Sequence, residues 1–216
     1  MSFNISEKLI AGLRDLHTEI VDVIYESETY IDPIGRVFED MPSFVRVVLV
    51  SKPGAGSYIR HELWLPDGWN GCFLGLGNGG MAGTIHYGTL ANRTRERYAV
   101  INTDMGTSRG RDSGVNNPDL IKDFGWRATY LMTKAGKLIT EEYYGSPIEK
   151  SYFFGTSTGG QQSMMLAQRF PEEYDGISAG VPANNRTNLH MSGLWILNAF
   201  RNGNVSGTRK VGRCPF

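Results

Sequence analysis

A serine between glycines is the feature of this chain that most directly indicates chemistry. Ser157 is the centre of the sequence GTSTG at residues 155–159, which fits the pattern G-x-S-x-G. The apolar residues 152–154 before it predict a short strand, and the spacing of residues 161–169 after it predicts a helix. Strand, pentapeptide and helix in this order predict a tight turn that presents a nucleophilic hydroxyl. The chemistry predicted is acyl transfer, with Ser157 as the nucleophile.

The two glycines of this pentapeptide have a steric purpose. A serine on a sharp strand-to-helix turn has a strained backbone, and side chains beside it would collide with the strand and the helix. The following helix directs backbone N–H groups and its positive end toward the group under attack. Because the chain contains 27 glycines, the pentapeptide alone also fits a chance occurrence. The flanking strand and helix favour the functional interpretation.

A second glycine-rich segment permits a different interpretation. Residues 75–80 (GLGNGG) contain G-x-G-x-x-G after a predicted strand, and Asp104 ends the next strand, as in a nucleotide-binding fingerprint. Tyr130 and Lys134 have the Tyr-x-x-x-Lys spacing of short-chain dehydrogenases. Three predicted strands precede these glycines, however, and no clear helix opens at Gly80 to bind a pyrophosphate. An NAD(P)-binding Rossmann-type oxidoreductase therefore stays a remote alternative.

Composition narrows the class of protein. The 216 residues suffice for one main core, and Lys plus Arg equals Asp plus Glu at 22 each. This balance gives no general attraction to nucleic acid or to an anionic membrane, so neither is expected as a partner. The two cysteines lie far apart and without clustered histidines, so we expect no metal and no cofactor. The first residues show no signal-peptide pattern, which favours a cytoplasmic location by default.

Hydrophobic periodicity predicts an α/β protein. Helices are expected at residues 6–16, 90–97 and 119–143. Besides the strand at 152–154, strands are expected at residues 19–25, 44–50, 58–65, 72–76, 98–102 and 176–179. Early strands followed by strand–helix alternation predict a mostly parallel sheet flanked by helices, with antiparallel strands at one edge. Residues 109–112 are expected to form a polar loop, and residues 202–216 an irregular tail.

With these elements placed, the chain resembles the tannase and feruloyl esterase family of α/β-hydrolases. The similar segments follow the family's order over a little more than half of the chain. They are residues 65–71 (LPDGWNG), 77–83 (GNGGMAG), 102–106 (NTDMG), 123–128 (DFGWRA), 143–145 (YYG), 155–160 (GTSTGG) and 167–176 (AQRFPEEYDG), continuing to Pro182 and Ala183.

The resemblance implies a function and a domain organisation. Members of the family hydrolyse esters of phenolic acids, so the implied activity is that of a serine carboxylester hydrolase on a small-molecule aromatic ester. Family chains are much longer, with a lid inserted after the strand near Ala179. The resemblance thus implies that residues 1–183 are the N-terminal part of an α/β-hydrolase core, truncated before its last strands. Residues 184–216 are expected to begin the lid or to form an irregular tail.

Two further implications concern cysteine and location. Family members commonly place a cysteine directly before the nucleophile, bridged to another after the catalytic histidine. Thr156 occupies that position here, so this bridge cannot form. Relatives are often secreted, in contrast to the absence of an export signal here, and localisation and oligomeric state stay open.

An oxyanion hole is expected from two separate segments. The backbone N–H of Thr158, directly after the nucleophile, should be the first donor. The turn at Gly79 and Gly80 should supply the second, because glycine lets the backbone approach a substrate oxygen closely. Without the resemblance, the same glycines also fit a tight flexible turn.

The catalytic acid and base are not identified. α/β-Hydrolases order their triad as Ser, then Asp or Glu, then His. His17, His61 and His86 precede Ser157, and His190 follows it by only 33 positions. His190 is a weak candidate for the base, and a lid or loop residue is the simpler interpretation. Asp104 and Asp175 are interpreted as structural.

The missing base leaves two alternatives open. The chain is either an esterase of this family or a catalytically inactive fragment or half-enzyme that lacks the triad Asp and His. In the second case a sheet cut before its last strands would expose an open edge and an apolar face.

Overall fold

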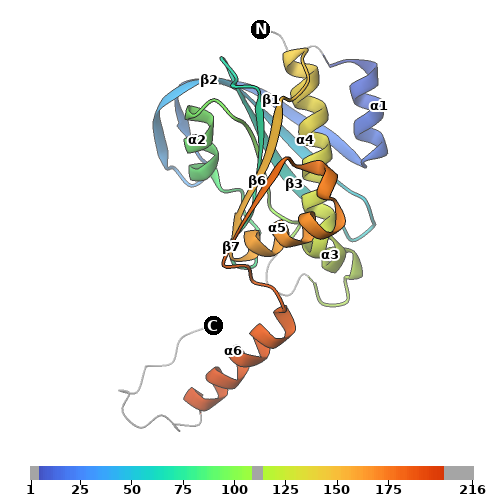
Figure 1. Cartoon of the computed structure of the whole chain (residues 1–216), viewed down its shortest axis with the longest axis vertical. Helices are drawn as coiled ribbons and strands as arrows, with labels where there is room; N and C mark the ends of the chain where they lie inside the picture. The colour runs from blue at the N-terminus through green and yellow to red at the C-terminus, as the bar shows by residue number, and fades with distance from the viewer. Residues whose placement is uncertain (1–4, 109–113, 202–216) are drawn as a thin grey trace. The chain divides into compact units, whose positions relative to one another are not determined.

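A computed structural model of the chain describes residues 5–108 and 114–201 (Figure 1). The expected polar loop at 109–112 and the expected tail at 202–216 lie outside the described residues. Two compact units are distinguished, Met1–Pro182 and Ala183–Phe216. The first unit contains the sheet and all strands of the described residues, and the second contains the helix α6, Arg186–Arg201.

The described strands form one mixed sheet with the order β1-β2-β3-β5-β4-β6-β7. The first three strands pair antiparallel, and β3 also pairs antiparallel with β5. The pairs β4–β5, β4–β6 and β6–β7 are parallel. The strands are β1 Thr18–Ile31, β2 Val37–Ser51, β3 Ile59–Pro66, β4 Cys72–Leu76, β5 Ala99–Thr103, β6 Lys150–Thr156 and β7 Gly176–Gly180.

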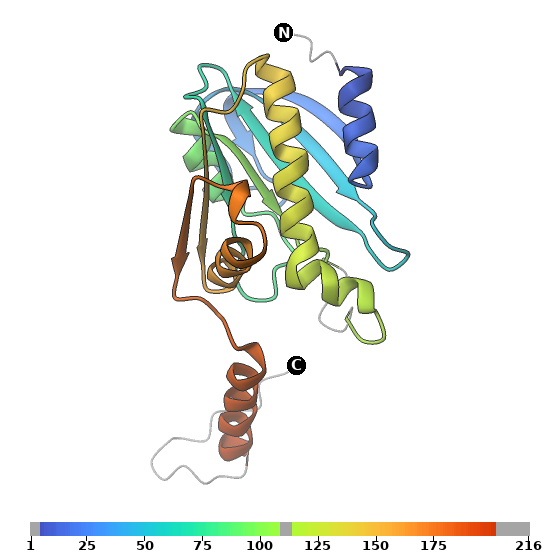
Figure 2. The ribbon, with the colours of Figure 1, turned by 45° about the vertical axis from the view of Figure 1, so that its right-hand side comes forward.

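Helices cover both faces of this sheet. In Figures 1 and 2, α2 lies on one face under the curled β1–β2 ribbon, whereas α1, α4 and α5 lie on the other. The helical segments of the first unit are α1 Glu7–Asp15, α2 Tyr87–Arg95, α3 Pro118–Lys122, the π-helix η1 Asp123–Arg127, α4 Ala128–Tyr144, α5 Thr158–Arg169 and the 3-10 turn η2 Pro171–Glu173.

Each face of the sheet has its own apolar core. On the α4 side the core contains Phe73, Ile101 and Ile139. On the α2 side it is aromatic: the rings of Tyr30 and Trp64 have centroids 4.6 Å apart in an edge-to-face arrangement. Such aromatic pairs add to the stabilisation from buried area. The two cores pack against the parallel strands. Since β4, β5, β6 and β7 run in the same direction, their carboxyl ends lie at the same end of the sheet.

The predicted fold class is confirmed, including the antiparallel strands at one edge. Several element bounds differ from those expected; for example, the strand expected at 19–25 extends from Thr18 to Ile31. Two larger differences concern helices. The single long helix expected at 119–143 is three segments, α3, η1 and α4, because the chain makes a π-helical turn at Asp123–Arg127. In addition, α6 is a regular helix in a region for which no regular element was predicted.

Contacts with a distant loop account for the π-helical turn. The Arg127 guanidinium donates to Asp123 Oδ1 at 2.6 Å and to Ser57 Oγ at 2.8 Å. Asp119 accepts a hydrogen bond from the Gly56 N–H at 3.2 Å. Ser57 lies 70 positions from Arg127, and Gly56 lies 63 positions from Asp119. Helical periodicity alone therefore could not have shown the break.

His61 is buried in β3, where it pairs with Thr103, the last residue of β5. Its Nε2 lies 2.9 Å from Ser51 Oγ, and its Nδ1 has no hydrogen-bond partner. Burial lowers the pKa of His61 to about 3. The folded protein therefore holds this imidazole in the neutral form over most of the acid range.

We expect this histidine to make folding stability depend on pH. In the unfolded chain His61 takes up a proton below its ordinary pKa of 6.5, whereas the folded chain does not until about pH 3. Stability should thus fall as pH falls from 6.5 toward 3, by about 2 kcal/mol at pH 5 relative to pH 8. Urea unfolding of the wild type and of His61→Gln at pH 8 and pH 5 measures this change in the free energy of unfolding. Between pH 8 and pH 5, the free energy of unfolding of His61→Gln should fall by about 2 kcal/mol less than that of the wild type. His17→Asn, which changes an exposed histidine, is the control and should lose as much stability as the wild type.

Candidate active site

Ser157 occupies a strained turn between β6 and α5. Its backbone has φ 61° and ψ −115°, a conformation that non-glycine residues rarely adopt and that costs about 1–3 kcal/mol. Its N–H donates to the Gly180 carbonyl at 3.0 Å, and its own carbonyl accepts from the Gln161 N–H at 3.1 Å. The residue is exposed, and its hydroxyl makes no capping bond to α5. The backbone is thus fixed while the hydroxyl stays available.

Three glycine backbones meet beneath this turn. A Cβ added to Gly155 would lie 2.1 Å from the Gly159 carbonyl oxygen, and one added to Gly77 would lie 2.5 Å from Gly159 Cα. One added to Gly159 would lie 3.1 Å from Gly77 Cα. Backbone cannot give way as a flexible side chain can. Glycine is therefore required here because strand β6, the start of α5 and the end of β4 approach one another at backbone distance.

The glycine-rich loop after β4 is tied to the first turn of α5. The Asn78 carbonyl accepts from the Gly159 N–H at 2.7 Å, and the Gly80 carbonyl accepts from Thr158 Oγ1 at 2.6 Å. Gly79 and Gly80 are exposed between these two attachments. The structure thus brings together Thr158 and the Gly79–Gly80 turn, the segments from which the sequence predicts oxyanion donors. The donor roles themselves stay a prediction.

Two amide side chains that sequence reasoning missed support this loop. Gln162 Oε1 accepts from the Asn78 N–H at 2.8 Å, and Gln162 Nε2 donates to Thr129 Oγ1 at 2.8 Å. Asn78 Nδ2 donates to the Thr103 carbonyl at 2.7 Å, which joins the loop to the end of β5. The available signal was a polar glutamine on the buried face of the helix after the pentapeptide.

The two aspartates interpreted as structural are bound elsewhere. Asp104 Oδ1 accepts from the backbone N–H groups of Arg60 and Gly106, at 3.0 and 2.8 Å, and burial raises the pKa of Asp104. Asp175 lies at the opposite end of β6 from Ser157. There the Lys150 ammonium, 2.9 Å away, is the main cause that lowers the pKa of Asp175 to about 2.

No histidine of the described residues is hydrogen-bonded to Ser157. His17 is exposed after α1, and His61 is buried against Ser51. His86 precedes α2, with its ring close to the glycine loop: a Cβ on Gly79 would lie 3.9 Å from His86 Cε1. His190 belongs to α6, in the second unit. The identity of the base stays open.

The dinucleotide-binding interpretation does not fit this fold. Residues 75–80 begin within β4, the fourth strand along the chain, and the next helix, α2, begins only at Tyr87. Tyr130 packs its ring on Phe170 with centroids 4.4 Å apart, and Lys134 is paired with Glu173 at 3.0 Å. Both residues of the dehydrogenase-like spacing therefore have structural partners.

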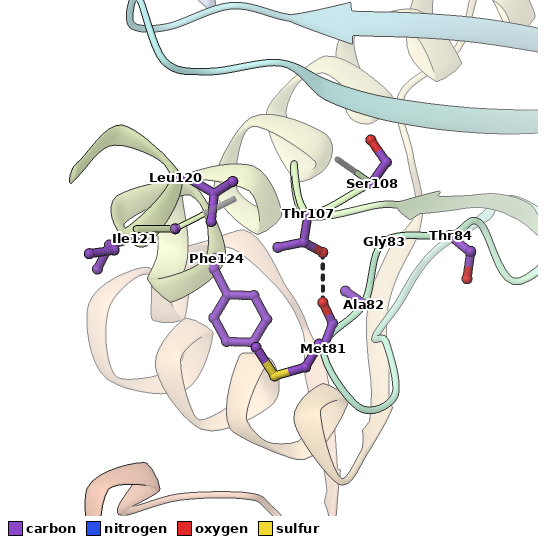
Figure 3. Close-up of a pocket in the computed structure, with 10 residues that line it drawn as sticks. Met81, Ala82, Gly83, Thr84, Thr107, Ser108, Leu120, Ile121 and Phe124 are labelled. Carbon is purple, nitrogen blue, oxygen red and sulfur yellow. Dashed lines mark hydrogen bonds between the residues drawn. The ribbon is translucent and has the colours of Figure 1, made fainter. Parts of the chain in front are cut away.

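An apolar cavity of about 470 Å³ lies on one side of the glycine-rich loop. Figure 3 shows Met81, Ala82 and Gly83 on one wall and Leu120 and Phe124, from α3 and η1, on the other. The Met81 carbonyl accepts from Thr107 Oγ1 at 2.6 Å, which attaches this wall to the loop after β5. The π-helical turn thus carries an aromatic ring into a cavity bounded by the loop that also contains Gly79 and Gly80.

Two features are absent from the part of the chain that the structure describes. It contains no group of three or more His, Cys, Asp or Glu side chains placed to hold a metal ion. Among its helices, none combines the length and apolar character needed to cross a membrane.

The sheet, the strained serine turn and the loop tied to it define an α/β-hydrolase core. A sequence model described as "Tannase and feruloyl esterase" matches residues 45–209. The chain belongs to the tannase and feruloyl esterase family.

Similar proteins agree with this assignment. A probable feruloyl esterase B-2 of Aspergillus flavus is 43% identical over 64% of this chain and 27% of its own length. An uncharacterized esterase of Xanthomonas campestris pv. campestris is 36% identical over 85% of this chain and 32% of its own length. The crystal structure of feruloyl esterase B from Aspergillus oryzae superposes with a TM-score of 0.75 and 29% identity, covering 87% of this chain and 39% of that one. This chain thus spans about a third or less of the curated relatives it matches.

The glycine contact beneath Ser157 leads to a test of stability. We expect Gly155→Ala to destabilise the fold by about 3 kcal/mol or more, because its Cβ would overlap the Gly159 carbonyl. Gly125→Ala is the matched control, since a Cβ there meets no atom within 4 Å. Urea unfolding of both variants measures the difference. A Gly155→Ala protein as stable as the control would contradict the close contact.

Proposed function

We propose that this chain carries the nucleophile of a serine carboxylester hydrolase that cleaves esters of aromatic, phenolic acids through an acyl-enzyme. The observation that carries the proposal is the backbone of Ser157, held at φ 61° between β6 and α5 with its side chain exposed. Membership of the tannase and feruloyl esterase family supports the substrate class.

In this proposal each element of the turn has one role. Ser157 Oγ attacks the ester carbonyl carbon, a general base transfers the Ser157 proton to the departing alcohol, and the acyl-enzyme forms. Water then attacks the acyl-enzyme, which releases the acid and restores the Ser157 hydroxyl. The backbone N–H of Thr158 and one from Gly79 or Gly80 stabilise the oxyanion that develops. Each such donor is typically worth about 2.7–4 kcal/mol in the transition state. The bond between Thr158 Oγ1 and the Gly80 carbonyl supports the spacing of the two donors.

The apolar cavity supports an aromatic substrate. Its walls include Phe124 and Met81, and both side-chain types make favourable contacts with aromatic rings. Met81 directly follows the two glycines that we propose as oxyanion donors. A ring bound in the cavity would therefore lie beside the loop that positions the ester carbonyl.

The alternative is that the chain by itself is a catalytically inactive fragment or half-enzyme. Three observations favour it. No described histidine is bonded to Ser157, β7 is an edge strand, and the apolar side chains of Tyr152 and Phe154 on β6 are 37% and 44% exposed. In this alternative the Asp and His are supplied by polypeptide outside this sequence, which would also cover the exposed face of β6.

A fluorophosphonate probe with mass-spectrometric mapping distinguishes the two proposals. An active hydrolase should be labelled at Ser157 and should lose labelling and ester hydrolysis in Ser157→Ala. Ser192→Ala, an exposed serine on α6, is the matched control and should label like the wild type. Without a base, only the effects of the oxyanion hole and binding would remain, so an unlabelled but folded chain would favour the half-enzyme. Labelling at another serine, or hydrolysis that survives Ser157→Ala, would overturn the assignment of the nucleophile.

A further inference from the structure

A second cavity, of about 600 Å³, lies between the β1–β2 turn and the start of α2. We propose that this cavity binds a small oxyanion, such as a carboxylate, through the guanidinium groups of Arg36 and Arg60. The proposal concerns binding alone and does not depend on the chemistry at Ser157.

The charged side chains of the described residues that line this cavity are all basic. Arg36, Arg60 and His86 are its titratable side chains apart from Tyr87, and no Asp or Glu of the described residues lines it. The remaining lining is apolar or uncharged, with Ile34 and Ile85 among it. A concave site with positive charges and apolar walls favours a ligand that combines a carboxylate with apolar surface.

The guanidinium of Arg60 forms no close ion pair among the described residues. Its side chain is half-buried at the start of β3 and makes no ion pair or side-chain hydrogen bond there. The nearby Asp104 binds the backbone N–H groups of Arg60 and Gly106, and the charge of Arg60 opposes the rise that burial causes in the pKa of Asp104. Asp104 acts on this guanidinium only through its charge, without a direct bond, whereas a partly desolvated charge is normally paired directly. A bound oxyanion would supply that partner.

Arg36 is held in place without using all its donors. Its Nε donates to Asp32 Oδ2 at 2.6 Å, and Asp32 also accepts from the Arg36 and Ile34 backbone N–H groups. An arginine side chain has five N–H donors, so the two terminal amino groups are left for a ligand in the cavity. The Asp32 contact pre-orients the guanidinium, which lowers the entropy cost of binding.

The charges of Arg36 and Arg60 affect the pKa values of His86 and Tyr87, the residues at the start of α2. Burial first, and then the charge of Arg36, lowers the pKa of His86. Burial and Glu62 raise the pKa of Tyr87, and the charge of Arg60 opposes that rise. The two arginines therefore line one cavity with the residues at the start of α2, and each affects one of those residues electrostatically. No side chain caps this helix, so its positive end adds to the potential in the cavity.

The cavity adjoins the proposed oxyanion loop. Gly83 and Thr84 line both this cavity and the apolar one, and the His86 ring lies behind Gly79. An anion bound here could be part of the ester substrate itself or a separate small molecule. Both sources share the chemistry that the arginines recognise.

Chemical-shift titration with benzoate and with benzamide tests the proposal. Benzamide has nearly the same shape without the charge. We expect benzoate to shift the amide signals of residues 83–89 and to bind at least roughly tenfold more tightly than benzamide, as expected for a charge-assisted hydrogen bond. Arg60→Met and Arg36→Met should each weaken benzoate binding by roughly tenfold. Arg95→Gln, at the other end of α2, carries the same charge change and should leave binding unaltered.

The outcomes separate the possibilities. Equal binding of benzoate and benzamide, unchanged binding in both arginine variants, or shifts elsewhere in the protein would overturn the proposal. If Arg60→Met does not fold, the benzoate affinities of Arg36→Met and Arg60→Lys test the proposal instead. Arg60→Lys should then retain at least part of the affinity for benzoate. Competition by inorganic phosphate would indicate a site for any small oxyanion, whereas its failure would restrict the site to organic carboxylates. Because benzoate is not an ester, these results are independent of labelling at Ser157.

Discussion

The close contact among Gly77, Gly155 and Gly159 is the constraint on which the rest of the site depends. A Cβ at Gly155 would overlap the Gly159 carbonyl, and a Cβ at Gly77 would overlap Gly159 Cα, so glycine is needed for β6, α5 and the end of β4 to approach this closely. Strand β6 ends at Thr156 and helix α5 begins at Thr158, so Ser157 alone makes the turn between them. The unfavourable backbone of Ser157 is sustained because hydrogen bonds to Gly180 and Gln161 hold it on both sides.

The same contact positions the loop that follows β4. Once Gly77 is packed on Gly159, residues 78–80 must pass over the first turn of α5, where Asn78 and Gly80 accept hydrogen bonds from Gly159 and Thr158. Gln162 then joins the loop to α4 through Thr129. A loop of exposed glycines is thereby ordered by a buried polar network, in which each satisfied hydrogen bond raises the cost of displacing the others.

Two cavities of opposite character flank this loop. On the side of η1 the walls are apolar, with Phe124 and Met81, and on the side of the start of α2 they carry Arg36 and Arg60. Gly83 and Thr84 contribute to both. A ligand with an aromatic ring and a carboxylate could therefore interact with this part of the chain in more than one way, although the two cavities are formed by different elements. The charge difference between them gives a physical basis for orienting such a ligand.

Local sequence determined much of this arrangement. The pattern around Ser157, the strand at Cys72–Leu76 and the helix after Ser6 depend on residues within a few positions of each other, so periodicity and glycine spacing sufficed to predict them. The family resemblance followed from the order of such local segments. Tertiary structure alone decided the π-helical turn, because Arg127 is held by Ser57 and Asp119 by Gly56. It also decided that Arg36, Arg60 and His86 share one cavity, since they come from three separate elements that meet only when β1 and β2 curl over α2. Contacts between distant segments leave no periodic signal in a single chain. For that reason a candidate nucleophile and the glycine turn beside it could be proposed from sequence, while the cavities around them could not.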